Sequence, residues 1–380
     1  MHKNRINVNW SYWELDQYFN NVDLIIIGGG IIGLFSAYFY KKANKSAKVL
    51  VLERGVSPMG ASSKNAGFAC FGSISELVSD EAKNGTELMM KIAERRIAGL
   101  ELLRKEIGDK AMEYKSLGGY ELFTNQKEFE KYHDLIDNYN ALFEKHLKMK
   151  KVFQNKSNVI SKFGFEGVKG LIFNQYEGQI NTGMLNKALM SKVNALGVKV
   201  LTGIEVQKIV DKQSYVELKT NHGYFTSKKV IVATNGLLST IMKDKRVKPA
   251  RAQVLITKPI KNLKIKGTFH YDEGYYYFRN INNRILFGGG RNLDFKGEET
   301  TTFAITEKIQ NKLENILSKI ILPNQPYEIE HRWAGIMGVG NEKIPIIEFH
   351  SKNVLLAVRM GGMGVAIGSL VGREAAKKML

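Results

Sequence analysis

A glycine-rich turn between an apolar strand and a helix constrains this chain more than any other feature of its sequence. Val22–Ile27 is a short apolar run that predicts a buried strand, and Ile31–Lys42 has the pattern of a helix. Between them, Gly28–Gly33 has the spacing G-x-G-x-x-G. A second buried strand is predicted over Lys48–Leu52, and Glu53 stands at its end. This order of strand, helix and strand predicts the start of a parallel, doubly wound sheet.

Each glycine of this turn has a physical reason to be there. Gly28 permits the tight turn, Gly30 lets the backbone approach a pyrophosphate, and Gly33 lets helix and strand pack closely. The N-terminus of the helix offers free N–H groups and a partial positive charge to the phosphates. Glu53 would accept hydrogen bonds from the ribose hydroxyls of an adenosine. We therefore expect a dinucleotide cofactor at this turn.

Three further blocks of small residues accompany the turn. Gly60–Gly67 reads GASSKNAG and follows the second strand, where its hydroxyls and amides could surround phosphates and a sugar chain. Val230–Gly236 reads VIVATNG, a buried strand that ends in Thr-Asn-Gly. Arg359–Val365 reads RMGGMGV, again between a predicted strand and a predicted helix. Two glycine-rich turns at opposite ends of the chain indicate one extended cofactor with two ends to hold.

Composition excludes several classes of protein. The 380 residues correspond to two domains at roughly 100–200 residues per domain, and 44% hydrophobic residues provide for a substantial core. The one cysteine, Cys70, excludes a disulfide scaffold and a cysteine-built metal site, and the histidines show no metal-ligand spacing, so no metal is predicted. Near the N-terminus there is neither the apolar core of a signal peptide nor a run of the ~20 residues that span a membrane. We expect a cytoplasmic protein.

The net charge of +19 has two interpretations. It can serve an anionic partner such as nucleic acid or acidic lipid, or it can be a solvated lysine-rich surface. The lysines are spread along the chain, with only modest clusters at 145–151 and 243–248. Neither cluster has the interleaved aromatic residues of a platform for single strands. A nucleic-acid partner stays open but is not favoured.

The remaining pattern places other material between two nucleotide-type ends. Residues 1–20 carry five aromatic side chains, which predicts an arm packed on the body. The region Ala250–Gly290 alternates and is rich in Tyr, Phe and Ile, as is typical of an antiparallel sheet. The other predicted elements are helices over 87–106, 127–151, 183–196, 306–320 and 365–379, and strands over 198–201, 206–210, 216–220, 230–233 and 354–358.

From about Val22 to Leu380 the chain resembles the FAD-dependent amino-acid and amine oxidoreductases of the D-amino-acid oxidase superfamily, whose familiar members are glycine oxidase and sarcosine oxidase. The resemblance rests on ordered blocks: IIIGGGIIG, VLERG, GASSKNAGF, VIVATNG, YYYFRNINNRILFGGG, HRWAGIMGVGNEKIPII and RMGGMGVAIGSLVGREAA. The dinucleotide turn alone is shared by many flavin and nicotinamide enzymes, whereas the later blocks in this order are specific to the superfamily.

The resemblance implies an α/β fold with a Rossmann-like FAD-binding domain built from discontinuous segments, and an α+β substrate domain with a mostly antiparallel sheet. The FAD-binding domain would comprise 21–88, 170–245 and 335–380, and the substrate domain 89–169 and 246–334. FAD would be bound non-covalently, because Cys70 does not lie where covalent members attach their flavin. The residues expected at the pyrophosphate are Gly28, Gly30, Ile31, Ile32 and Gly33, and those expected at the adenosine are Glu53, Arg54 and Val206. The residues expected along the ribityl chain and flavin are Ala61, Ser62, Asn65, Ala66, Gly67, Phe68 and Thr234. The residues expected at the isoalloxazine are Met360, Gly361, Gly362, Met363, Gly364, Val365 and Ala366.

The chain departs from the pattern of glycine-oxidase-like members at the substrate. Those members have an arginine that clamps the substrate carboxylate, and Met337 stands at that position here. Because a thioether cannot make a bidentate clamp, glycine itself is expected to be a poor substrate. The arginines that could replace the clamp are Arg279, Arg291, Arg332 and Arg359. Of these, Arg279 and Arg359 are the expected catalytic-site residues, together with Tyr276, which matches the substrate-side tyrosine of the family.

The activity that the resemblance implies is oxidation of the C–N bond of a primary or secondary amine or amino acid. Hydride passes to flavin N5, the imine hydrolyses, and the electrons reach oxygen or another acceptor. Two alternatives remain open at this point. One is an FAD enzyme that modifies the side chain of a tRNA wobble uridine, and the other is a quinone-linked amino-acid dehydrogenase at a membrane surface.

Overall fold

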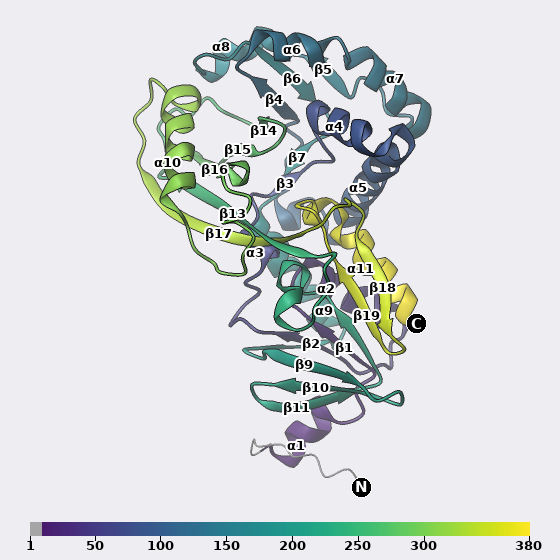
Figure 1. Cartoon of the computed structure of the whole chain (residues 1–380). Coiled ribbons are helices and arrows are strands. Elements are labelled where there is room, and N and C mark those ends of the chain that lie inside the picture. Colours follow the sequence, from purple (N-terminus) through teal and green to yellow (C-terminus); the bar gives the residue numbers. More distant parts are fainter. Residues whose placement is uncertain (1–9) are drawn as a thin grey trace.

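A parallel sheet forms the half of the molecule that contains the glycine turn. The computed structural model describes residues 10–380, and Figure 1 shows this sheet in the lower half of the view. Its strand order is β18-β19-β12-β1-β2-β8, and all neighbours are parallel except β18 and β19. The strands are β1 (Leu24–Ile27), β2 (Val49–Glu53), β8 (Lys199–Thr202), β12 (Lys229–Val232), β18 (Ile346–Ser351) and β19 (Val354–Val358).

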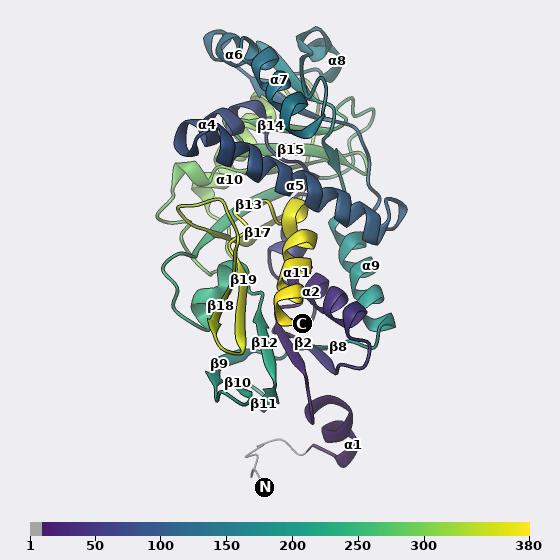
Figure 2. The same cartoon turned by 90° about the vertical axis from the view of Figure 1, so that its right-hand side faces the viewer.

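Both faces of this sheet are covered, which explains why its strands are continuous apolar runs. One face packs on α2 (Ile31–Ala43), α5 (Thr86–Ile107), α9 (Thr182–Ala195) and α11 (Gly364–Met379). The other face packs on a three-stranded sheet of β9 (Val206–Asp211), β10 (Val216–Thr220) and β11 (Gly223–Ser227). The first and last predicted helices of the chain therefore lie together on the same sheet, as Figure 2 shows for α2 and α11.

Small residues allow α11 to pack closely against its neighbours. A Cβ atom at Gly372 would lie 2.5 Å from Cβ of Phe35 in α2. A Cβ atom at Gly99 in α5 would lie 2.1 Å from the carbonyl oxygen of Ala366, and Ser369 donates a hydrogen bond of 2.6 Å to the carbonyl oxygen of Gly99. These contacts join the two ends of the FAD-binding pattern to the long helix α5.

An eight-stranded sheet forms the upper half of the molecule (Figure 1). Its order is β17-β13-β16-β15-β14-β4-β6-β5, antiparallel except where β14 pairs with β4. One face packs on α10 (Glu307–Ile316) around a cluster of stacked phenylalanine rings, among them Phe269 and Phe278 at 4.7 Å between centroids. The strands are β4 (Gly119–Phe123), β5 (Phe153–Asn155), β6 (Gly170–Asn174), β13 (Lys248–Thr257), β14 (Thr268–Tyr271), β15 (Tyr276–Ile281), β16 (Arg284–Gly289) and β17 (Ile329–Val339).

Helices cap the far end of this sheet. The predicted helical stretch 127–151 forms two helices, α6 (Gln126–His133) and α7 (Ile136–Leu147), and the short α8 (Ile160–Phe163) follows. α4 (Ile74–Asn84) is a helix that was not predicted from the sequence, although Ser73 and Glu76 form a capping box at its start. A two-stranded pair of β3 (Phe68–Ala69) and β7 (Gly178–Gln179) connects the two halves of the molecule.

The predicted fold class is confirmed, since a covered parallel sheet and a mostly antiparallel sheet are both present. Two predicted domain boundaries fall within the eight-stranded sheet. Residues 170–174, assigned to the FAD-binding domain, form β6 and pair with β4 and β5, and β17 crosses the boundary at 334/335. The pairing therefore groups 170–174 with the predicted substrate domain, and the division into domains stays a prediction.

The predicted N-terminal arm is described from residue 10 onward, and residues 1–9 lie outside the described part. It contains the short turn of helix α1 (Tyr12–Glu14). Phe19 packs edge-on against Phe225 of β11, with 4.9 Å between ring centroids. Tyr12 and Trp13 are 70% and 72% exposed, so the packing of the arm rests on Phe19 and not on these two side chains.

Candidate active site

One cavity of about 580 Å³ lies where the two large sheets meet. It is lined from below by residues that follow the carboxyl ends of β1, β2, β12 and β19, and from above by β13, β15, β16 and β17. Crevices at the carboxyl ends of parallel strands are where open α/β sheets bind their ligands. The glycine turn and the predicted substrate strands therefore share one space.

The backbone of the glycine turn is packed too closely to admit side chains at Gly28, Gly30 or Gly33. Gly28 has a φ of +107°, a conformation that favours glycine, and a Cβ atom at Gly33 would lie 1.9 Å from the carbonyl oxygen of Gly28. A Cβ atom at Gly30 would lie 2.7 Å from Oγ of Ser62, which accepts a hydrogen bond of 2.9 Å from the N–H of Ile31. Any side chain at Gly30 would therefore clash with Ser62, which is hydrogen-bonded to the backbone at the start of α2. This geometry fits a pyrophosphate group.

Glu53 is buried at the end of β2 and holds the turn itself. Its Oε2 accepts a hydrogen bond of 2.9 Å from the N–H of Gly29, and its Oε1 accepts one of 2.9 Å from the N–H of Gly55. A carboxylate offers about four acceptor positions, so these bonds leave capacity for the predicted ribose hydroxyls. Glu53 and the adjacent Arg54 both line the cavity.

The GASSKNAG block forms α3 (Ala61–Lys64) and a loop that its own side chains stabilise. Asn65 donates to the carbonyl oxygens of Ala61 and Ser62, and its Oδ1 accepts from the N–H of Gly67 at 2.8 Å. The indole N–H of Trp333 in β17 donates to the carbonyl oxygen of Lys64 at 2.9 Å. Asn65 lines the cavity, but its amide is used within the loop, which makes it a support for that wall.

The last glycine turn is connected to the Thr-Asn-Gly turn through Asn235. Oδ1 of Asn235 accepts hydrogen bonds from the N–H groups of Arg359 at 3.0 Å and Met360 at 3.2 Å. Thr234 also lines the cavity, and its hydroxyl oxygen is buried with no hydrogen-bond partner among the described residues. Because buried hydroxyls normally have a partner, this one indicates that a ligand supplies it.

The structure brings nearly all predicted cofactor residues to the cavity. Only Gly33 does not line it; it lies behind the wall, where it permits the contact with Gly28. The lining residues are Gly28, Gly30, Ile31, Ile32, Glu53, Arg54, Ala61, Ser62, Asn65, Ala66, Gly67, Phe68, Val206, Thr234, Met360, Gly361, Gly362, Met363, Gly364, Val365 and Ala366.

The predicted substrate-side tyrosine requires a correction. Tyr276 is 2% exposed and packs in the core with Tyr271 and Phe287, on the face of β15 that turns away from the cavity. Tyr275 and Tyr277 line the cavity instead. Alternation along a strand puts neighbours on opposite faces, and sequence alone does not say which face meets the ligand. Burial raises the pKa of Tyr277 to about 12, so its hydroxyl is protonated.

The two predicted arginines do not line the cavity. Arg279 is buried, its side chain lies against Gly67, its Nε has no partner among the described residues, and burial lowers its pKa to about 10. Arg359 has a φ of +67° and donates to the carbonyl oxygen of Ile344 and to Glu342. Arg359 thereby holds the loop between β17 and β18 and points away from the cavity-lining turn.

Of the four arginines considered from the sequence, Arg291 is the one that lines the cavity. Its guanidinium lies 4.7 Å from the centre of the Phe295 ring and has no hydrogen bond or ion pair with any described residue. Burial lowers its pKa below the ordinary value. Arg332, in contrast, is bound to Gln310 and Glu314 outside the cavity. Met337 lines the cavity, as expected for the clamp position.

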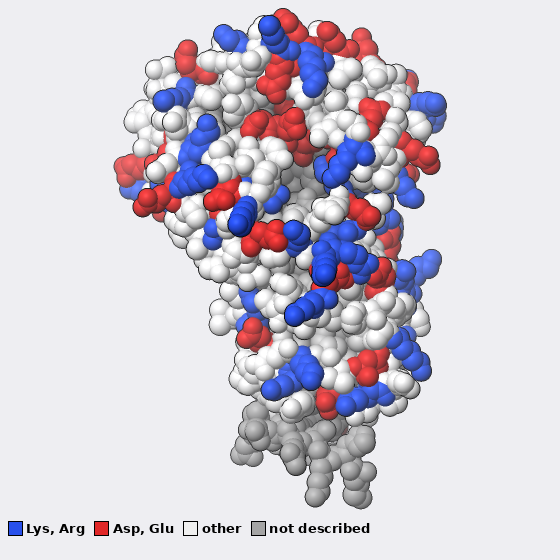
Figure 3. Space-filling view, in the orientation of Figure 1, with Lys and Arg blue, Asp and Glu red and all other residues white. Residues whose placement is uncertain are grey.

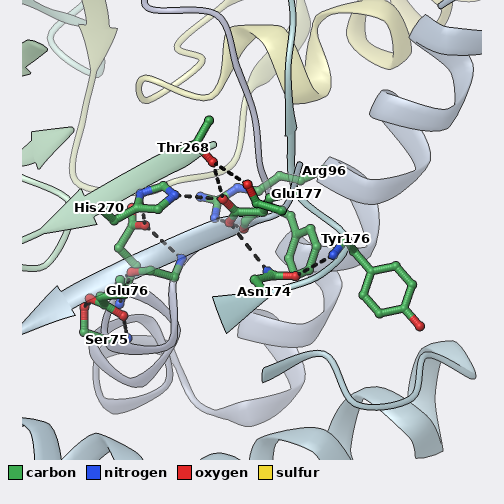
Figure 4. A network of polar contacts seen from close by, with 12 residues as sticks. Ser75, Glu76, Arg96, Asn174, Tyr176, Glu177, Thr268 and His270 are labelled. Carbon is green, nitrogen blue, oxygen red and sulfur yellow. Dashed lines mark hydrogen bonds and ion pairs between the residues drawn. The ribbon is translucent and has the colours of Figure 1, made fainter. Parts of the chain in front are cut away.

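A cluster of buried polar residues that the sequence analysis missed lies in the same wall. His270 of β14 contacts Glu177 at 2.9 Å through Nε2, and its Nδ1 lies 3.8 Å from Oε2 of Glu76 (Figure 4). Burial by itself lowers the pKa of His270, but the charge of Glu177 and its hydrogen bond, together with Glu76, raise it to about 9. Cys70, Glu76 and His270 line the cavity. These residues are remote in sequence, so no spacing could have indicated them.

The charges on the outer surface are mixed. Figure 3 shows Lys and Arg interspersed with Asp and Glu over this face, and many of these charges form ion pairs such as Arg284 with Glu330. Within residues 10–380, no helix combines the length and apolar character needed to cross a membrane.

The chain is similar both to curated proteins and to solved structures. The chain is 24% identical to the probable oxidoreductase OrdL of Haemophilus influenzae over 98% of this chain and 86% of that protein. It is 21% identical to a D-amino acid dehydrogenase of Helicobacter pylori over 92% and 93% of the two chains.

Two solved structures share the fold. The glycine oxidase of Geobacillus kaustophilus has a TM-score of 0.76 at 18% identity and covers 94% of each chain. The L-proline dehydrogenase of P. horikoshii has a TM-score of 0.72 at 20% identity, over 94% of this chain and 92% of that one. The family described as FAD dependent oxidoreductase matches residues 23–378. With the glycine cradle and the shared cavity in place, the chain belongs to this DAO family of FAD-dependent oxidoreductases.

Proposed function

We propose that this protein oxidises the C–N bond of a small primary or secondary amine or amino acid, with non-covalently bound FAD as its cofactor. The observation that carries the proposal is the single cavity in which the glycine cradle continues into a chamber lined by Tyr275, Tyr277 and Arg291. The names of its relatives support the class, since they include amino-acid oxidases and dehydrogenases.

The residues present fit FAD from one end to the other. Ile31 and Ile32 at the start of α2 would hold the pyrophosphate, Glu53 and Val206 the adenosine, and Met360–Ala366 the isoalloxazine. When bound, FAD supplies the two-electron acceptor for the C–N bond. The N-terminus of α11 places its partial positive charge beside this end of the cavity. The one cysteine, Cys70, does not match the position at which covalent members of the superfamily attach their flavin, which favours a cofactor without a thioether link.

The substrate chamber favours an amine that carries an anionic group. The guanidinium of Arg291 has no hydrogen bond or ion pair with any described residue, and a carboxylate could pair with it. The partial burial of Arg291 strengthens such a pair, because desolvation weakens competition from water. Arg291 would thus take over the function that Met337 cannot perform. The hydroxyl of Tyr277 is a second donor facing the chamber.

The proposal is tested with purified protein under anaerobic conditions. We expect yellow protein that releases intact FAD on denaturation, and amines or amino acids that bleach the flavin. Arg291→Met should raise KM for carboxylate-bearing amines by about 10- to 100-fold, the loss expected for a charge-assisted contact of about 1.5–3 kcal/mol. Arg332→Met is the matched control, since Arg332 pairs outside the cavity, and it should change KM little.

Two results would contradict the proposal in different ways. Protein that binds no FAD, or whose FAD stays attached after denaturation, would refute the cofactor assignment. Bleaching that is equally efficient with and without a carboxylate on the amine, and insensitive to Arg291→Met, would refute the substrate assignment alone.

A further inference from the structure

Three residues with metal-binding side chains meet in the wall of the cavity. Cys70 follows β3, Glu177 lies in the turn between β6 and β7, and His270 belongs to β14. Their ligand atoms, Sγ, a carboxylate oxygen and an imidazole nitrogen, all lie within 4.8 Å of one another, and all three residues are buried. Figure 4 shows Glu177 and His270 directed toward each other from different segments of the chain.

The three side chains form a donor set that zinc uses. Thiolate, imidazole and carboxylate are its common protein ligands, and catalytic zinc sites combine three of them with one open position. Cys70 and His270 line the cavity, so the fourth position would face it. Water or a donor atom of a bound small molecule would complete the tetrahedron there.

A second carboxylate lies behind the imidazole of His270, at ion-pair distance. Oε2 of Glu76 lies 3.8 Å from Nδ1 of His270, on the side of the ring opposite Glu177. A carboxylate behind a ligating imidazole fixes the orientation of the ring and increases its basicity. Thr268 and Asn174 each approach the carboxylate of Glu177 at 3.5 Å.

Glu177 and Cys70 retain coordination capacity for an ion between them. Glu177 is fully buried, and its carboxylate has one hydrogen bond of 2.9 Å with His270 and two longer ones of 3.5 Å from Thr268 and Asn174. The thiol of Cys70 has no hydrogen-bond partner among the described residues. Without an ion Glu177 is paired with His270, and a divalent ion would replace this pairing and compensate Glu177 and a Cys70 thiolate together.

We propose that Cys70, Glu177 and His270 form a binding site for one divalent cation of the zinc class. On binding, Cys70 releases its thiol proton and His270 releases the proton on Nε2, so that both lone pairs reach the ion. Without the ion, His270 and Glu177 form a hydrogen bond with each other. The site lies in the wall of the same cavity as the proposed function, but neither FAD nor an amine substrate is one of its three protein ligands.

The test uses the FAD-containing protein after dialysis against a chelator, titrated with Co²⁺ and then with Zn²⁺. The chain has one cysteine, so a thiolate-to-cobalt charge-transfer band in the difference spectrum can come from Cys70 alone. We expect one equivalent of Co²⁺ with this band and with the visible bands of a tetrahedral site. Zn²⁺ should displace the cobalt and remove both.

Variants separate this site from metal bound elsewhere. Cys70→Ala should abolish the charge-transfer band, His270→Gln should weaken binding by about 100-fold or more, and Glu76→Gln should weaken it by about 10- to 100-fold with the band retained. His350→Gln, an exposed histidine, should bind as the wild type does. FAD content and melting temperature verify that each variant is folded. If His270→Gln does not fold, the result for Cys70→Ala alone tests the cation site. A wild type without the band, or Cys70→Ala that binds Co²⁺ unchanged, overturns the proposal.

Discussion

The two halves of the cavity wall are built in different ways. The cofactor half consists of turns whose residues are consecutive in sequence, and backbone atoms and glycines shape it, as at Gly28 and Gly30. The substrate half consists of single side chains, such as Tyr277 and Arg291, that separate strands and turns bring together. A wall made of backbone tolerates almost no added atom, whereas a wall made of side chains can change residue by residue. Predictions for the two halves should therefore differ in kind.

The largest effect is expected at Gly33, where the contact is backbone against backbone. In Gly33→Ala the new Cβ atom would lie 1.9 Å from the carbonyl oxygen of Gly28. We expect loss of bound FAD and a decrease of about 3 kcal/mol or more in the free energy of unfolding. The flavin-to-protein absorbance ratio and urea denaturation measure the two quantities.

The control for Gly33 is Gly183→Ala in the first turn of α9. The nearest atom to its new Cβ would be Oδ1 of Asn181 at 3.4 Å, an ordinary contact. This variant should keep its FAD and should not lose stability, since alanine is favoured over glycine in helices by about 1 kcal/mol. Gly33→Ala with a normal FAD content would show that the cradle is less tightly packed than described.

Tyr276 in the core and Tyr277 at the cavity should respond differently to substitution. Tyr276→Ala should lower the free energy of unfolding by about 3–5 kcal/mol, because it removes a buried aromatic side chain from the core. Tyr277→Phe should leave stability nearly unchanged and lower kcat/KM by about 2- to 10-fold, the value of one hydrogen bond in the chamber. Tyr276→Phe should leave kcat/KM unchanged. The reverse result for the two phenylalanine variants would restore Tyr276 as the substrate-side tyrosine.

Asn235 tests the connection between two glycine turns in the cofactor half. Asn235→Ala leaves the N–H groups of Arg359 and Met360 without their acceptor. We expect a loss of about 1–3 kcal/mol in stability and weaker FAD binding, measured by thermal denaturation and by flavin titration. Asn235→Asp keeps an acceptor oxygen and should recover most of the loss. Equal behaviour of both variants would mean that the side chain does not hold the turn.

The smallest effect is a pH dependence at the edge of the cofactor half. Although burial raises the pKa of Asp211, hydrogen bonds from Ser351 and Asn353 lower it to about 2. Because the pKa of Asp211 is lowered, its ionised carboxylate stabilises the folded protein at pH values above the ordinary pKa of 3.8. This stabilisation disappears as the pH falls toward 2. The stability difference between wild type and Asp211→Asn should be constant from pH 7 to pH 5 and decrease below pH 4. A difference that grows on acidification would contradict the lowered pKa.

Almost every cofactor residue that the sequence predicted lines the cavity, and the contacts of these residues with a cofactor stay a prediction. Gly28, Glu53 and Thr234 could be placed at the cavity because each lies at or just after the end of a buried strand, where the turn is determined by neighbouring residues. The ends of α2 and β2 were predicted from the local sequence pattern to within about one residue. α4 was not predicted, although its capping box is present in the sequence.

The substrate half was decided by the tertiary structure. Sequence alone determined that Tyr275, Tyr276 and Tyr277 alternate, but only the packing of β15 on the phenylalanine core determined that Tyr276 points inward. Four arginines were candidates for one function, and only the folded chain distinguishes Arg291 as the one of the four that lines the cavity. Cys70, Glu177 and His270 became neighbours through pairing of distant strands. Local backbone patterns can be read along a chain, whereas contacts between remote side chains depend on sheet registers that no local pattern specifies.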